Sequence, residues 1–99
     1  MTISGKTKSG FEFEIDDGKV KDFTYVEHVA DMTDEEAPDL VRLRACVNFV
    51  RHIMGREGLA DLKAHVAALH DGVADTTTVM GECMEINGII QAAGKDAKN

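Results

Sequence analysis

The chain has 99 residues, of which 43% are hydrophobic and 29% are charged, a composition that fits one globular domain over residues 1–99. Eighteen Asp and Glu against eleven Lys and Arg give a net charge of −7, which repels phosphate backbones and disfavours nucleic acid as a partner. No stretch approaches the roughly 18 apolar residues that a membrane span needs, and the first twenty residues are too charged for a secretory signal. We therefore expect a cytoplasmic protein with no membrane partner.

The first 17 residues alternate apolar and polar side chains on either side of a polar turn at residues 8–10. The apolar members are Ile3, Phe11, Phe13 and Ile15. This alternation predicts a β-hairpin over residues 1–17 with one apolar face. Because an isolated hairpin is only marginally stable, helices are expected to cover that face.

Apolar residues then recur with helical spacing, which predicts a helical part over residues 22–94 and a polar tail over residues 95–99. Asp22 is suited to cap the first short helix, Gly55 to end a helix that begins near Pro38, and Gly94 to end the last helix, which begins near Thr76. The fold class expected is α+β and predominantly α-helical, with an N-terminal β-hairpin followed by three to four short helices.

The helix predicted over residues 38–54 carries two apolar stripes. The first stripe, spaced by the i, i+3, i+4, i+7 rule, consists of Leu40, Leu43, Val47, Val50 and Met54. The second stripe, beside it, consists of Cys46, Phe49 and Ile53. With both stripes apolar, this helix is predicted to be central and packed on two sides.

Residues capable of chemistry are present, but their spacing does not predict a reaction. His65 and His70 are five residues apart, whereas a helical metal pair needs three or four. Glu82 and Glu85 have no histidine beside them in the sequence and are expected on a solvated helix face. The four histidines are likewise expected at the surface, and Cys46 and Cys83 are expected to be reduced and buried. We therefore expect no enzyme, no metal and no cofactor.

Met80 and Met84 lie one turn apart on the last predicted helix, away from the core stripe of Val79, Ile86 and Ile90. Methionine adapts to irregular apolar surfaces, so these two residues, together with Ile89, are candidates for contact with a partner or with a second copy of the chain. The alternative is a wider core in which the hairpin covers them.

Positive charge concentrates around Gly55. The residues concerned are Arg42, Arg44, Arg51, His52, Arg56 and Lys63. A small DNA-binding or transcription-associated helical domain, with a helix-turn-helix at Gly55, is therefore the main alternative to a protein-binding domain.

The order of elements is informative as a whole: a hairpin ending FEFEIDD, a short helix DFTYVEHVADM, an apolar helix VRLRACVNFVRHIMG, then LADLKAHV and a terminal VMGECMEINGIIQAAGKDAKN. This order resembles the tail assembly chaperones encoded just before the tape measure gene of long-tailed bacteriophages and prophages. The resemblance implies a non-catalytic protein that binds the tape measure protein, keeps it soluble, helps recruit tail-tube subunits and is absent from the mature virion.

The resemblance also implies a frameshift site near the end of the gene, which would extend the chain into a longer product. Codons that could carry a slippery heptamer fall at Gly94 and Lys95, or at Lys98 and Asn99. The gene sequence tests this directly.

Overall fold

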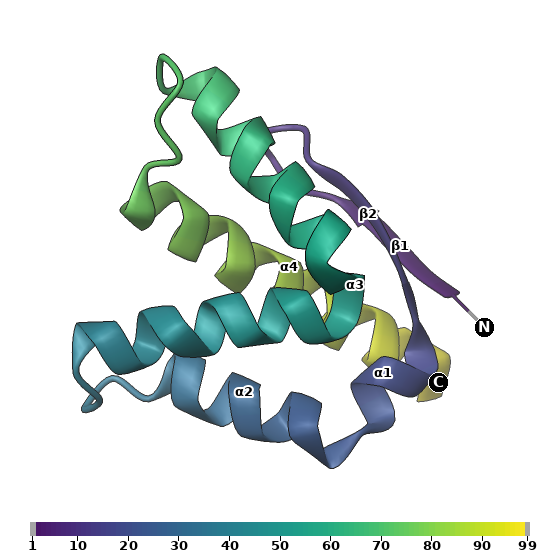
Figure 1. Ribbon diagram of the computed structural model, residues 1–99. Coiled ribbons are helices and arrows are strands. Elements are labelled where there is room, and N and C mark those ends of the chain that lie inside the picture. The colour runs from purple at the N-terminus through teal and green to yellow at the C-terminus, as the bar shows by residue number, and fades with distance from the viewer. Residues whose placement is uncertain (1, 99) are drawn as a thin grey trace.

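The computed structural model describes the backbone of residues 2–98 and the side chains of residues 2–94. The chain is 71% helical and, within the described residues, an antiparallel hairpin of two strands precedes four helices (Figure 1). This arrangement confirms the α+β, predominantly helical fold class.

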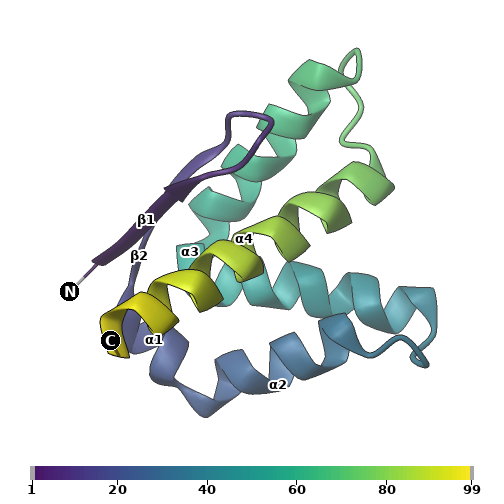
Figure 2. The same cartoon turned by 180° about the vertical axis from the view of Figure 1, so that it is seen from behind.

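The hairpin pairs β1 (Thr2–Lys6) with β2 (Glu12–Asp16), and its register places Ile3 opposite Ile15 and Gly5 opposite Phe13. Gly10 has a φ of +100° in the turn, a conformation that glycine adopts without steric cost. Phe11, Phe13 and Ile15 are buried, because the hairpin packs against α3 through β2 and against α4 through β1 (Figure 2). The helices therefore cover the apolar face, as the alternation predicted.

Gly5 marks the closest approach between the hairpin and α4. A Cβ atom at this position would lie 2.7 Å from Cγ2 of Ile89 and 2.9 Å from Cζ of Phe13. We expect Gly5→Ala to destabilise the fold by about 1–3 kcal/mol, because overpacking forces neighbouring side chains to shift. Gly88→Ala is a matched control, since a Cβ there meets nothing within 4 Å. The Gly88→Ala change should stabilise the fold by about 0.5–1 kcal/mol, and urea unfolding measures both variants.

Two short helices follow the hairpin. The first, α1 (Asp17–Lys21), begins at the Asp16 cap and was not predicted, because one turn containing a glycine gives no apolar periodicity. The second, α2 (Phe23–Thr33), begins where Oδ1 of Asp22 accepts a hydrogen bond from the backbone N–H of Thr24 at 3.0 Å. This bond confirms Asp22 as a cap.

The central element is α3 (Asp39–Leu69), which bends sharply at Gly55. Gly55 has φ +73° and ψ −177°, so the helical hydrogen-bonding pattern is interrupted and the two halves run in different directions (Figure 1). The predicted helix end at Gly55 thus corresponds to a break between two helical halves. The first half packs against α2, which is its most extensive helical neighbour.

The two apolar stripes of α3 are buried to different extents. Cys46 and Phe49, from the second stripe, are fully buried, whereas Leu40 is 78% exposed and Leu43 and Val47 are only half-buried. The reason is that α2 and α4 pack on the side of α3 that carries Cys46 and Phe49. Tyr25 of α2 contacts this side, with its ring centroid 5.8 Å from that of Phe49.

The last helix, α4 (Thr76–Lys98), begins where the Asp75 carboxylate accepts hydrogen bonds from the backbone N–H and hydroxyl of Thr78. These bonds hold the pKa of Asp75 below its usual value, so the cap is charged at neutral pH. The prediction that Gly94 ends this helix was wrong, because α4 continues to Lys98. Alanine and lysine, both good helix formers, surround Gly94 and outweigh its cost of about 1 kcal/mol.

Among residues 2–98, no helix combines the length and the apolar character needed to cross a membrane.

Candidate partner-binding surface

The three residues predicted to contact a partner lie in different environments on α4. Ile89 is half-buried, and its position against Gly5 of β1 shows that the hairpin covers it. Met80 is half-buried and packs against the core, whereas the Met84 side chain remains 39% exposed. Of the three, Met84 therefore offers the largest accessible apolar surface.

Apolar side chains of α3 lie close to this part of α4. The two helices meet where Sγ of Cys83 lies 4.0 Å from the backbone oxygen of Cys46. From this contact the helices diverge toward their first residues, which lie on the same side of the molecule (Figures 1 and 2). On these two diverging segments, apolar side chains remain partly or largely accessible on α3 and on α4. We call them together the α3–α4 apolar surface: Leu40, Leu43, Val47, Met80 and Met84.

The acidic turn between α2 and α3 borders this surface. Asp34, Glu35, Glu36 and Asp39 are all exposed and immediately precede Leu40. Charged groups beside an exposed apolar patch keep the free protein from self-aggregating through it.

A second feature, missed by the sequence analysis, fixes the hairpin turn to the helices. Glu82 is only 6% exposed, and its Oε1 accepts hydrogen bonds of 2.8 Å from the hydroxyls of Thr7 and Ser9. Oε2 of Glu85 accepts from the backbone N–H of Lys8 at 2.6 Å. The prediction of a solvated face was therefore wrong for Glu82, whereas Glu85 stays half-exposed and its hydrogen bond lies at the surface. The hairpin turn is their partner, and it lies more than 70 residues away in the sequence.

His65 extends this network from the second half of α3. Its Nε2 lies 2.9 Å from Oγ of Ser9. Because the single hydroxyl proton of Ser9 is directed to Glu82, Nε2 of His65 is the donor in this contact. Serine thus lies between the histidine and the carboxylate, whereas a hydrolytic triad requires histidine between the other two. The cluster holds elements together and does not activate Ser9.

We expect Glu82→Ala to destabilise the fold by about 2–4 kcal/mol, because the Thr7 hydroxyl would lose its buried partner and the hairpin turn its anchor. Glu12→Ala is the matched control, since the Glu12 side chain is 77% exposed on the hairpin; it should change stability by less than about 0.5 kcal/mol. Urea unfolding followed by circular dichroism gives both values. Equal effects of the two changes would contradict the anchoring role.

The other histidines do not gather into a metal site. Nε2 of His52 lies 3.0 Å from the backbone oxygen of Lys19, and its ring contacts that of His28 with centroids 6.0 Å apart. His52 is thus more buried than predicted, whereas His70 is exposed. Among the side chains that the structure describes, those of residues 2–94, no group of three His, Cys, Asp or Glu is arranged to hold a metal ion.

Cys46 and Cys83 are free and fully buried, as predicted. A hydrogen bond between the two thiols, together with burial, raises the pKa of Cys83 well above its usual value. Its thiol therefore stays protonated and unreactive, and it serves as a small apolar group at the contact of α3 with α4.

Two of the cationic or imidazole side chains near Gly55 have structural roles. Nε of Arg42 donates to the backbone oxygen of Met32 at 3.3 Å, and His52 contacts the end of α1. Arg51, Arg56 and Lys63 remain exposed around the bend of α3.

Of the positions linked to a frameshift, Gly94, Lys95 and Lys98 lie within α4, and Asn99 lies outside the described residues.

Compared with known proteins, the chain matches no family model, no curated sequence and no solved structure. These comparisons do not test the resemblance to tail assembly chaperones, which stays a prediction from the order of the elements.

Proposed function

We propose that this chain is a tail assembly chaperone of a long-tailed phage or prophage. It acts in the host cytoplasm without catalysis, binds the tape measure protein, keeps it soluble and helps recruit tail-tube subunits. The observation that carries the proposal is the α3–α4 apolar surface, in which Met84 is 39% exposed and Leu40 is 78% exposed.

The chemistry of this surface suits a helical client. A long amphipathic helix exposes an apolar stripe that aggregates in water until another apolar surface covers it. Leucine, valine and methionine side chains on two diverging helices can contact such a stripe, and methionine adjusts to different side chains along it. A net charge of −7 on the chaperone then keeps the complex soluble.

The binding requires neither a nucleotide nor a reaction. Burial of apolar side chains supplies the driving force, at about 25 cal/mol per Å² removed from water. Release follows when the client's stripe is covered by the tail-tube subunits that replace the chaperone. This sequence of events explains why the chaperone would be absent from the finished particle.

Co-expression with the protein encoded directly downstream tests the proposal. We expect that protein to be largely insoluble alone and soluble, in a complex that co-elutes with the chaperone, when both are present. A Met84→Asp, Leu40→Asp variant should fail to keep it soluble. A downstream protein that is soluble without the chaperone, or that never co-elutes with it, would contradict the proposal.

A further inference from the structure

The bend of α3 forms a shallow hollow of about 230 Å³ that is lined by cationic and apolar side chains. We call the cations Arg51, Arg56 and Lys63 its rim, and the apolar residues Leu59, which is half-buried, and Ala60 its floor. We call these five residues the basic elbow. A second hollow, lined by His28, Asn48, Arg51 and His52, shares Arg51 with it and extends it along α3 toward α2.

The rim cations are available to a partner. Arg51, Arg56 and Lys63 are exposed, and within the residues whose side chains are described none of the three forms an ion pair. Over residues 51–63, the three rim cations outnumber the exposed carboxylates of Glu57 and Asp61, which gives a net charge of +1 in a chain whose total is −7. The elbow is therefore a local positive region on a negative molecule.

We propose that the basic elbow binds an acidic amphipathic helix of a partner polypeptide. Carboxylates spaced three or four residues apart on such a helix can pair with Arg51, Arg56 and Lys63. A leucine or similar side chain between them contacts Leu59 and Ala60 on the floor. This site shares no residue with the α3–α4 apolar surface, and its partner is selected by charge as well as by apolar contact.

A nucleic acid fits the elbow less well than an acidic helix does. The floor residues Leu59 and Ala60 offer no side-chain hydrogen bond to a phosphate or to a base edge. Three cations give only a small counterion release, and the surrounding negative charge opposes a long polyanion. An acidic helix places its few charges at the rim alone and supplies the apolar side chain that the floor accepts.

Titration of the folded chain with a synthetic helical peptide tests this site. The peptide has about 18 residues, or five turns, with leucine along one face and glutamate on both sides of it. We expect binding at about 50 mM NaCl that weakens at about 500 mM. Arg51→Glu with Arg56→Glu should weaken it at least about tenfold, measured by fluorescence anisotropy, with circular dichroism confirming that the variant is folded.

Lys6→Glu with Lys8→Glu is the matched control, because it changes the net charge equally at exposed positions outside the elbow. It should leave peptide binding within about twofold of the parent chain. Met84→Asp should leave the salt-dependent part of peptide binding unchanged, which separates this site from the proposed chaperone surface, where binding is apolar.

Three results would overturn the proposal. The first is equal loss of binding in the control and elbow variants. The second is equal binding of a peptide in which lysine replaces every glutamate. The third is failure of the acidic peptide to bind while a DNA duplex, or a second copy of the chain, binds in a manner that the elbow variant abolishes.

Discussion

Phe49→Ala is expected to lower the free energy of unfolding by about 3–5 kcal/mol. Phe49 is fully buried in α3 and contacts the ring of Tyr25, so truncation leaves a cavity between α2 and α3 that neighbouring side chains fill only partly. The loss is a large fraction of the total stability of a domain of this size. Urea unfolding monitored by circular dichroism measures it.

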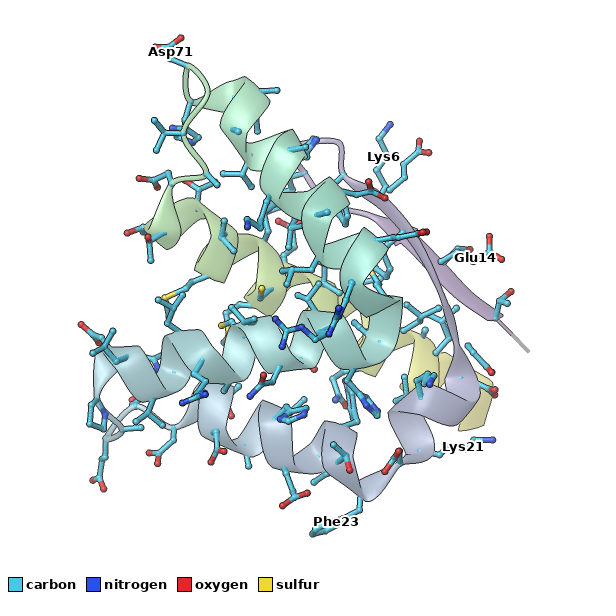
Figure 3. The ribbon with its side chains drawn as sticks, in the orientation of Figure 1. Lys6, Glu14, Lys21, Phe23 and Asp71 are labelled. Atoms are coloured by element: carbon cyan, nitrogen blue, oxygen red, sulfur yellow. The ribbon has the colours of Figure 1, made fainter. Side chains whose placement is uncertain are left out.

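Phe23→Ala is the control for this prediction. Phe23 is 72% exposed near the start of α2 and points away from the molecule (Figure 3), so the same truncation should change stability by less than about 0.5 kcal/mol. Similar losses for both variants would mean that the packing between α2 and α3 is not what stabilises this region.

Met84→Asp is expected to reduce binding of the helical client at least about tenfold while leaving the chain folded. The charge is placed on a side chain that is already 39% exposed, so the folded monomer loses little, but a bound apolar stripe would have to desolvate the carboxylate. Met80→Asp differs because Met80 packs against the core, and it should destabilise the monomer itself.

Phe23→Asp controls for the loss of an exposed apolar side chain elsewhere. It lies on α2, outside the α3–α4 apolar surface, and should leave client binding unchanged. Isothermal titration with a purified helical segment of the client measures all three variants. Equal binding of the client by the parent chain and by Met84→Asp would show that Met84 does not contact the client.

Local signals in the sequence were sufficient for much of the fold. The alternation around residues 8–10 predicted the hairpin, Asp22 predicted the start of α2, and Gly55 predicted the break in α3. Each of these depends on a few neighbouring residues, whose conformational preferences remain the same in the folded chain.

Features set by distant residues could not be predicted in this way. The sequence around Glu82 predicts a surface residue, whereas its burial depends on Thr7 and Ser9 of the hairpin turn. The choice between the two stripes of α3 depended on which side α2 and α4 pack against. The exposure of Leu40 follows from that choice, so part of the candidate surface was identified only in the structure.

Methyl NMR of methionine tests the central claim most directly, because Met32, Met80 and Met84 differ in their burial. On addition of a helical segment of the client, the Met84 methyl signal should shift or broaden most and that of Met80 less. The signal of Met32, which is fully buried, should stay unchanged. A client that binds without perturbing Met84, or that perturbs all the methionines equally, would contradict a contact at the α3–α4 apolar surface.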